Sequence, residues 1–255
     1  MHNLIKVAVY MQKSRYQKLS FVIPVYNEEK TLETLLNLIL SADLGIQKEL
    51  IIINDCSTDR TGEILKKFSD NPIIKIVAND VNMGKSISVK RGIGMTSGDL
   101  VVVQDADLEY DPQDLKKFVD IFNTQSVDIV YGNRFAKRNE VLYWHVWLGN
   151  MFLSFVSALI TGIRAGMWIR DAHVCYKMVK GDIMRDLGRK ITSTSGFGFD
   201  TEISARLSKV KINGKHLKLA QVPVSYTPRT MGDGKKLRPV TDGLKALWEI
   251  LKYNF

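Results

Sequence analysis

The sequence has few of the residues that would mark it as anything other than a globular protein. Its 255 residues include two cysteines and six prolines, too few for a disulfide framework or a proline-rich disordered chain. The N-terminal apolar run is short, is broken by Lys6, and has no small residues suited to signal-peptide cleavage. No internal repeat is visible. We therefore expect one domain over residues 1–255 in a reducing, cytoplasmic compartment.

The chain also lacks any concentrated block of charge. It carries 36 lysines and arginines against 27 acidic residues, a formal net charge of +9, and this excess favours anionic partners. The basic residues are scattered, and no zinc finger, recognition helix or aromatic RNA-binding pattern appears. We expect no nucleic-acid partner. Phosphorylated ligands and anionic lipid headgroups remain as candidates.

The first half of the chain alternates β-branched runs with helical patterns. The spacing predicts strands at 19–25, 50–53, 73–77 and 100–103, and helices at 29–40, 58–68 (capped by Ser57 or Thr58) and 86–94. Continuous apolar strands separated by helices are typical of a parallel sheet covered on both faces. We predict an α/β fold with a mostly parallel central sheet flanked by helices, and ligands beyond the carboxyl ends of its strands.

Acidic and polar side chains follow three of these strands, at 24–28, 54–57 and 104–107. Helix capping accounts for Ser57 and Asp59. It does not account for Asp105 and Asp107, because a second carboxylate beside the first adds repulsion that a cap does not need. Two carboxylates one residue apart suit an oxygen-ligated divalent cation, Mg²⁺ or Mn²⁺.

A series of short motifs extends this pattern along the chain, at 22–28, 54–59, 82–85, 104–107, 107–112, 131–135, 171–177, 196–202 and 222–229. In this order they resemble the family 2 glycosyltransferases, and in particular the branch similar to dolichyl-phosphate mannosyltransferase. The resemblance covers about residues 19–255. It implies a GT-A fold in which residues 19–135 bind a nucleotide sugar (GDP-mannose or UDP-glucose type) and 136–255 bind the acceptor. It also implies inverting, metal-dependent transfer to a polyprenyl phosphate at the cytoplasmic face of a membrane.

The resemblance also assigns roles by position. The residues expected to bind the donor are Pro24, Tyr26, Glu28, Asp55, Lys85 and Asp105, and those expected to bind the metal are Asp105, Asp107 and Glu109. The usual Asp-Asp-Gly-Ser motif reads Asn-Asp-Cys-Ser at 54–57, which loses one carboxylate and the turn glycine. The choice between guanine and uracil therefore stays open. His145 stands nearest to the place where relatives carry an acceptor-side arginine.

Transfer from a nucleotide diphosphate sugar requires positive charge at the leaving pyrophosphate. The best candidates are Arg134, Arg229, Lys235 and Lys236, since arginine in particular matches phosphate oxygens. We expect Arg134 and His145 to hold the acceptor phosphate, with Lys235 nearby, and Arg229 to bridge donor and acceptor. Glycines and basic residues in 226–236 are typical of a loop that closes over an anionic ligand.

Two alternatives to a phosphate acceptor remain. A glycan hydroxyl acceptor would need a general base, and Asp200 and Glu202 are the candidates. Either residue could equally cap or salt-bridge the helix that follows. The other alternative is a nucleotide-sugar-binding protein without catalysis, against which the intact pair of Asp105 and Asp107 argues.

The stretch 141–163 carries no formal charge apart from His145 when protonated. Its small and polar residues fall on one helical face, and the large apolar ones, which include Trp144, Trp147, Phe152 and Phe155, on the others. We expect the polar stripe to pack on the protein and the aromatic face to enter a lipid interface. A buried core helix and a membrane-crossing helix are the alternatives. The helix at 242–253 could likewise pack on the core or lie on an anionic membrane.

Overall fold

The computed structural model describes residues 15–194, 198–230 and 239–255. Its main strands are β1 (Lys18–Val25), β2 (Gln47–Asn54), β3 (Ile74–Ala78), β4 (Leu100–Val103), β5 (Ile129–Asn133), β6 (Lys177–Lys180) and β9 (Leu219–Pro223). The helices are α2 (Leu32–Ser41), α3 (Thr61–Lys66), α4 (Lys85–Ile93), α5 (Leu115–Thr124), α6 (Trp144–Ala165), α7 (Gly181–Lys190), α8 (Gly198–Lys209) and α9 (Pro239–Asn254). Two 3₁₀ turns, Pro112–Asp114 and Arg134–Ala136, and a small hairpin of β7 (Lys211–Ile212) and β8 (Lys215–His216) complete the described elements.

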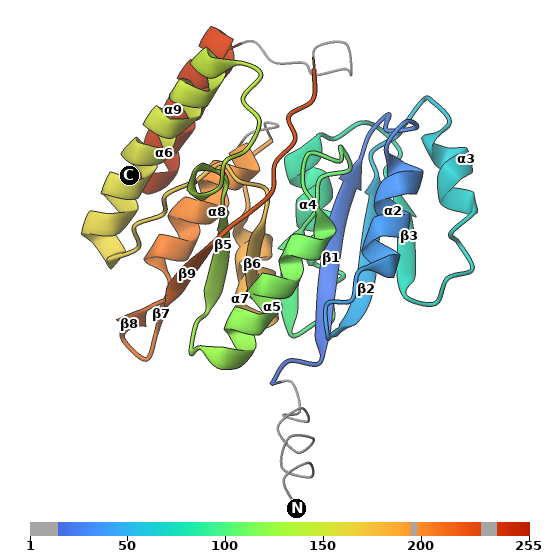
Figure 1. Ribbon diagram of the computed structural model, residues 1–255, viewed down its shortest axis with the longest axis horizontal. Coiled ribbons are helices and arrows are strands. Elements are labelled where there is room, and N and C mark those ends of the chain that lie inside the picture. Colours follow the sequence, from blue (N-terminus) through green and yellow to red (C-terminus); the bar gives the residue numbers. More distant parts are fainter. Residues whose placement is uncertain (1–14, 195–197, 231–238) are drawn as a thin grey trace, which may run out of the picture.

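The main strands form one mixed sheet in the order β3-β2-β1-β4-β6-β5-β9 (Figure 1). Strands β1 to β4 run parallel, with Leu19 opposite Leu100 and Leu50 opposite Ile74. Strand β6 is antiparallel to both of its neighbours, and β9 is parallel to β5. The predicted α/β fold with a mostly parallel sheet is confirmed. The reversed strand β6, from residues 136–255, lies between β4 and β5, which both come from residues 19–135.

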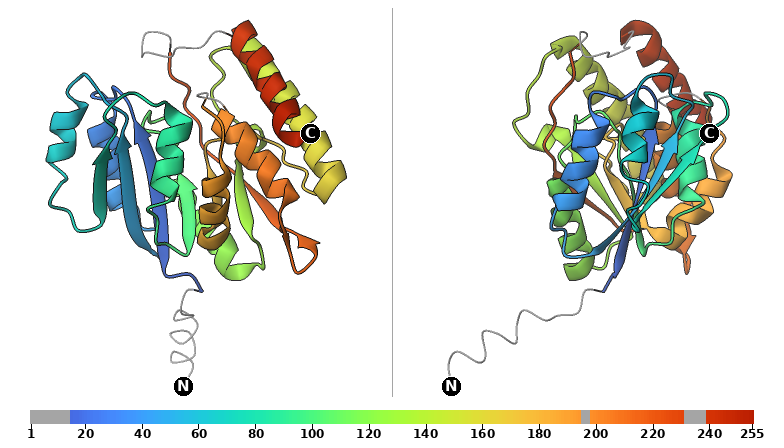
Figure 2. Two further views of the ribbon diagram at one scale, coloured as in Figure 1. Left: turned by 180° about the vertical axis from the view of Figure 1, so that it is seen from behind. Right: turned by 90° about the vertical axis from the view of Figure 1, so that its right-hand side faces the viewer.

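Helices cover both faces of the sheet, as the side view in Figure 2 shows: α2 and α5 lie on one face, and α4 and α7 on the other. Because both faces of the sheet are covered, the central strand β4 is apolar along its whole length, and its four residues all lie in the core. Helix α8 packs beside α7, and α6 and α9 pack against α8 as an outer layer. Because β1, β2 and β4 run parallel, the polar residues at their carboxyl ends lie at one edge of the sheet.

Helix α3 begins at Thr61, three residues later than the predicted start at residue 58. The predicted cap at Ser57 or Thr58 is wrong. The backbone N–H of Thr61 donates to Asp59 Oδ1 at 2.9 Å, whereas Ser57 Oγ accepts from the backbone N–H of Asn27 at 3.1 Å. Asp59 thus makes the local bond expected of it, and Ser57 instead ties the loop after β2 to the loop after β1.

The outer helix α6 divides into two kinds of surface. Leu153, Ser154, Ser157, Thr161 and Gly162 are buried, and Thr161 Oγ1 donates to the carbonyl oxygen of Met167 at 2.7 Å. The exposed large side chains are Trp144, Trp147, Leu148, Met151, Phe152, Phe155, Leu159 and Ile163. The structure confirms the predicted division between a packed small-residue stripe and an aromatic outer face, except that His145 and Gly149 are exposed.

Helix α9 lies beside α6 and exposes a second set of apolar side chains. Ala246 and Ile250 are buried against Leu153 of α6. Leu244, Trp248 and Leu251 point away from this contact and are exposed. Within the described part of the chain, α6 is long and apolar enough to cross a membrane, by length and composition alone. It is not a buried core helix, because large aromatic side chains such as Phe155 are 65% exposed.

Helix α4 approaches the sheet closely because Gly92 has no side chain. A Cβ at Gly92 would lie 2.5 Å from Val22 Cγ1 and 3.3 Å from Ile53 Cγ1. By contrast, a Cβ at Gly62 in α3 would meet nothing within 4 Å. The close contact fixes α4, whose first residue, Lys85, reaches the acidic edge of the sheet.

We expect Gly92→Ala to lower the free energy of unfolding by about 1–3 kcal/mol, because the added methyl group overpacks the contact with β1. The matched substitution Gly62→Ala should be neutral or stabilising by up to about 1 kcal/mol, since alanine is the better helix former. Urea unfolding followed by circular dichroism measures both. Equal stabilities for the two variants would contradict the close packing of α4.

Candidate functional site

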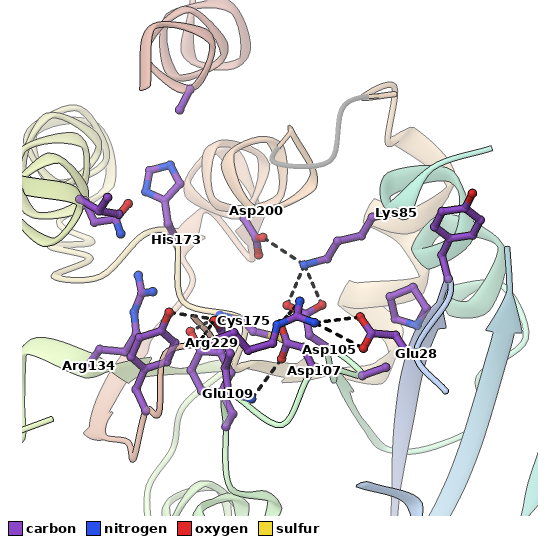
Figure 3. A pocket seen from close by; sticks show the side chains of 18 of the residues that line it. Glu28, Lys85, Asp105, Asp107, Glu109, Arg134, His173, Cys175, Asp200 and Arg229 are labelled. Carbon is purple, nitrogen blue, oxygen red and sulfur yellow. Dashed lines mark hydrogen bonds and ion pairs between the residues drawn. The ribbon is translucent and has the colours of Figure 1, made fainter. Parts of the chain in front are cut away.

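A cavity of about 480 Å³ opens at the carboxyl ends of β1, β2 and β4. Its walls come from both halves of the chain: the loops after these strands, the start of α4, the segment 173–175, α8, the segment 226–229, and α6 and α9. Figure 3 shows the acidic side chains on its floor, with Lys85 and Arg229 directed toward them. The edge predicted from the parallel strands is therefore the place where the candidate residues meet.

The floor carries an alternating arrangement of charges. Lys85 Nζ lies 2.7 Å from Asp105 Oδ1 and 2.8 Å from Asp105 Oδ2. Arg229 contacts two carboxylates: its Nη1 lies 3.2 Å from Glu28 Oε1, and its Nη2 lies 3.2 Å from Asp107 Oδ2. Arg229 Nε is buried and makes no hydrogen bond within the described residues. Arg229 thus spans from the loop after β1 to the loop after β4.

The carboxylates outweigh these cations at Asp107. Burial and the negative charges of Asp105 and Glu109 raise the pKa of Asp107 to about 7, and Arg229 counteracts them only in part. A buried carboxylate with other negative charges beside it fits an added divalent cation. Asp105 and Asp107 supply the oxygen donors that Mg²⁺ and Mn²⁺ take, and such ions are held by one or two carboxylates together with substrate phosphates.

Glu109 does not join this pair as the resemblance implied. Its Oε2 accepts from the Tyr226 hydroxyl at 3.1 Å, and its Oε1 accepts from the backbone N–H of Arg229 at 2.9 Å. Leu108 adopts a left-handed backbone, with φ of 59°, which turns the chain between Asp107 and Glu109. Among the described residues, no group of three or more acidic, histidine or cysteine side chains forms a metal-binding cluster. Glu109 instead anchors the segment that carries Arg229.

All of the expected donor-binding residues line the cavity: Pro24, Tyr26, Glu28, Asp55, Lys85 and Asp105. Asp55 is nearly buried and braces the neighbouring loop. Its Oδ1 accepts from the backbone N–H of Met83 at 2.9 Å and its Oδ2 from that of Gly84 at 2.8 Å. Tyr26 is 40% exposed at the rim. Asp55 therefore shapes the start of α4, and Tyr26 offers an accessible ring.

The two candidate bases lie in different surroundings. Asp200 lines the cavity, and its Oδ1 lies 2.6 Å from the ammonium of Lys177. Glu202 is fully buried and is not among the lining residues. Its carboxylate accepts from the backbone N–H groups of Thr192 and Ser193 and pairs with Arg206. Glu202 thus fixes the segment before α8 to that helix, as the salt-bridge alternative predicts.

The acceptor-side candidates lie on the wall toward α6. Arg134 makes a bidentate ion pair with the buried Asp171, through Nε to Oδ2 and Nη2 to Oδ1, both at 2.8 Å. Its Nη1 has no hydrogen-bond partner in the described parts of the chain. His145, at the start of α6, is exposed and lines the same cavity. Lys235 and Lys236 lie outside the described residues.

A second cavity, of about 250 Å³, adjoins this wall. It shares Arg134, Val146, Asn150 and Tyr226 with the first cavity, and Lys137, Arg138 and Trp147 are among its other lining residues. The cavity therefore combines basic and apolar side chains and leads from Arg134 toward the exposed face of α6.

Two residues of the motif at 171–177, to which the sequence assigned no role, also belong to this site. Lys177 lies in β6 with its side chain 2% exposed and pairs with Asp200. His173 lines the cavity, and burial lowers its pKa to about 4 against the opposing effect of Asp200. A lysine inside an apolar strand is a signal that could have identified Lys177, because a buried ammonium needs a partner. For His173 the only signal is its place in that motif.

Three of the loops that form the site contain left-handed residues other than glycine. Asn27, Cys56 and Leu108 have φ of 55°, 61° and 59°. This region of backbone is unfavourable for side chains such as those of cysteine and leucine. Such strain is characteristic of functional sites whose loops are held by their surroundings. At Cys56 it explains why the resembled motif has glycine at this position.

The chain is similar in sequence to transferases whose names include a polyprenyl phosphate. It is 29% identical to a dolichol-phosphate mannosyltransferase of Pyrococcus furiosus, over 93% of this chain and 64% of that protein. It is 36% identical to an undecaprenyl-phosphate 4-deoxy-4-formamido-L-arabinose transferase of Photorhabdus laumondii, over 52% of this chain and 42% of that protein. The chain thus spans less than two thirds of the length of these relatives.

Solved structures show the same fold at lower identity. Glucosyl-3-phosphoglycerate synthase of Mycobacterium tuberculosis, in complex with Mn²⁺ and UDP, matches with a TM-score of 0.62 and 19% identity, over 93% of this chain and 78% of the other. TarS 1–349 of S. aureus with UDP-GlcNAc matches with a TM-score of 0.60 and 17% identity, over 93% and 66%. The expected GT-A fold is confirmed. The model of glycosyl transferase family 2 matches residues 20–188, and the chain therefore belongs to this family of glycosyltransferases.

Proposed function

We propose that the protein transfers a hexose from a nucleotide diphosphate sugar, of the GDP-mannose or UDP-glucose type, to a polyprenyl phosphate at a membrane surface, with inversion at the anomeric carbon. The observation that carries this proposal is a single cavity that joins the Asp105 and Asp107 carboxylates to Arg134 and to helices α6 and α9. Both relatives described above are named for transfer involving a polyprenyl phosphate.

The donor half of the cavity fits a nucleotide diphosphate. Asp105 and Asp107 would hold Mg²⁺ or Mn²⁺, which supplies neutralising charge for the leaving diphosphate. Lys85 and Arg229 lie beside these carboxylates, and both can donate to diphosphate oxygens. Tyr26, Pro24 and Asp55 form the wall at which the base and ribose would bind. The solved relative with Mn²⁺ and UDP is consistent with such a ligand.

The acceptor half favours a phosphate over a hydroxyl. A hydroxyl acceptor needs a general base, and a low pKa makes a carboxylate a weak one. Burial alone would raise the pKa of Asp200, but its ion pairs with Lys177 and Lys85 outweigh burial and lower the pKa. Glu202 lies outside the cavity. A phosphate is already an anion and needs positioning, which Arg134 Nη1 and His145 would provide.

The exposed faces of α6 and α9 support docking on a membrane surface. Apolar side chains such as Trp144, Phe155 and Trp248 are each more than 60% exposed, and the lysines and arginines of the chain exceed its acidic residues. Amphipathic helices of this kind bind in the lipid interface through apolar area and attraction to anionic headgroups. Because both helices also line the first cavity, a docked protein would present its acceptor wall to the lipid.

We expect Asp107→Asn to reduce sugar transfer by about 100-fold or more, about 2.7 kcal/mol, because one of two oxygen ligands for the metal is lost. Transfer of radiolabelled sugar from GDP-mannose and UDP-glucose into polyprenyl phosphate, in detergent with Mg²⁺ or Mn²⁺, measures this. Asp120→Asn, on the exposed surface of α5, is the control and should keep wild-type activity.

The Asp107→Asn protein should unfold at no lower a temperature than wild type, because Asp105 and Glu109 repel the native carboxylate. Wild-type rates of transfer in this variant would contradict the metal assignment. Donor hydrolysis by the wild-type protein without any lipid product would contradict the phosphate acceptor and favour a hydroxyl.

We expect the double substitution Phe155→Ser and Trp248→Ser to weaken binding to anionic vesicles by at least about tenfold, since each large side chain contributes about 1.5 kcal/mol or more when buried in lipid. Sedimentation with vesicles of phosphatidylcholine and phosphatidylglycerol measures this binding. Ile212→Ser alters an exposed apolar residue on the β7–β8 hairpin and should leave binding unchanged. Unchanged vesicle binding by the double variant would show that binding does not depend on α6 and α9.

A further inference from the structure

A chain of alternating charges leads from the floor of the cavity into the core. Lys85 Nζ lies within 2.8 Å of both Asp105 oxygens and 3.7 Å from Asp200 Oδ2. Asp200 Oδ1 in turn lies 2.6 Å from Lys177 Nζ. The order is therefore Asp105, Lys85, Asp200, Lys177, and it runs from a candidate metal ligand to a lysine that is 2% exposed.

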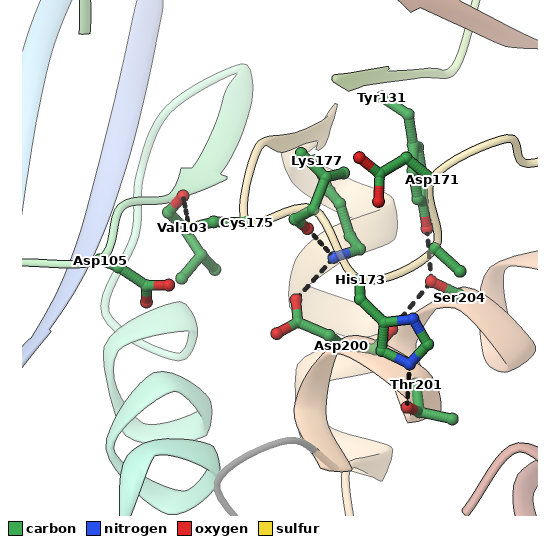
Figure 4. Close-up of polar contacts among 12 residues, drawn as sticks. Val103, Asp105, Tyr131, Asp171, His173, Cys175, Lys177, Asp200, Thr201 and Ser204 are labelled. Atoms are coloured by element: carbon green, nitrogen blue, oxygen red, sulfur yellow. Dashed lines mark hydrogen bonds and ion pairs between the residues drawn. The ribbon is translucent and has the colours of Figure 1, made fainter. Parts of the chain in front are cut away.

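The inner end of this chain is fixed. Lys177 Nζ donates to Asp200 and to the carbonyl oxygen of Val174, and it lies 5.6 Å from the centre of the Tyr131 ring (Figure 4). Tyr131 and Ser204 hydroxyls are 2.9 Å apart, and Ser204 donates to the backbone carbonyl of Asp200 at 2.8 Å. These bonds join β5, β6 and α8, so the Asp200 carboxylate has little freedom to move.

The outer end is held less tightly. Lys85 is one quarter exposed, and its contact with Asp200 is a full ångström longer than its contact with Asp105. Asp200 is already balanced by Lys177, whereas Asp105 has no second lysine or arginine among the described residues within ion-pair distance. An ammonium and a divalent cation that bind the same Asp105 oxygens must compete for them.

We propose that Asp200, fixed by Lys177, is a positioning residue that offers the Lys85 ammonium a second carboxylate, so that Lys85 can leave Asp105 for the donor diphosphate when the metal ion binds. The inference rests on the proposed function, because it assumes a diphosphate donor and a metal at Asp105. Lys85 thus has two successive partners, Asp105 and then the diphosphate. The buried pair of Asp200 and Lys177 serves this exchange, because the Asp200 carboxylate stays near the Lys85 ammonium after that ammonium leaves Asp105.

The test measures the binding of Mn²⁺ and of nucleotide and does not depend on sugar transfer. Mn²⁺ binding is measured by electron paramagnetic resonance on the protein alone, and binding of UDP and GDP by calorimetry with Mn²⁺ present. Lys85→Met should bind Mn²⁺ alone at least about threefold more tightly, because a competing cation is removed. The same variant should bind the nucleotide about tenfold or more weakly, because a charged hydrogen-bond donor is lost.

Lys75→Met, on the exposed side of β3, is the matched control and should change neither affinity. Lys85→Gln replaces Lys85→Met if the latter does not fold. If wild type binds neither nucleotide, the proposed function itself fails. If wild type binds a nucleotide and Lys85→Met matches it in both titrations, only the present inference is overturned.

A double-mutant cycle tests the role of Asp200 itself. Asp200→Asn leaves Asp105 as the one carboxylate for Lys85, so that the ammonium is harder to displace and Mn²⁺ should bind several-fold more weakly. In the Lys85→Met background the same substitution should have less than half of this effect. Equal losses in the two backgrounds would show that Asp200 does not act through Lys85 and would overturn its positioning role.

Discussion

The arrangement of the site depends on the repulsion among carboxylates that follow two neighbouring parallel strands, β1 and β4. The fold brings Glu28, Asp105 and Asp107 to one edge of the sheet, where burial makes their mutual repulsion expensive. Two cations from distant parts of the chain, Lys85 and Arg229, compensate it. Arg229 thus adds ion pairs between the C-terminal part of the chain and the loops after β1 and β4, and the excess of negative charge makes the edge suitable for a divalent ion.

Local sequence patterns predicted the elements that form this edge, since each depends on residues close together in the chain. The strand 100–103 was predicted to the residue, and the strands at 19–25 and 73–77 to within one residue. The reversed direction of β6 and the pairing of β5 with β9 could not be predicted in this way. They depend on contacts between segments 40 or more residues apart, which no periodicity encodes.

The candidate site was predictable where a residue type alone implies its chemistry. Asp105 and Asp107, whose carboxylates suit a divalent cation, line the cavity, and so do the other residues that the resemblance assigns to donor binding. The prediction for Glu109 differs from the structure because a left-handed residue, Leu108, turns it toward Tyr226, and such a turn is not evident from a leucine. The role of Lys177 was missed because a lysine in a strand has many uses, and the structure is needed to show it buried against Asp200.

The central claim is that the acidic edge is a site for a metal ion and a diphosphate. Its most direct test is anomalous diffraction from a crystal of the protein grown with Mn²⁺ and UDP or GDP. The account predicts one Mn²⁺ bound by oxygens of Asp105 and Asp107, with the diphosphate completing its ligands and Lys85 within hydrogen-bond distance of that diphosphate. Nucleotide bound with Mn²⁺ elsewhere, or with Lys85 still on Asp105, would contradict it.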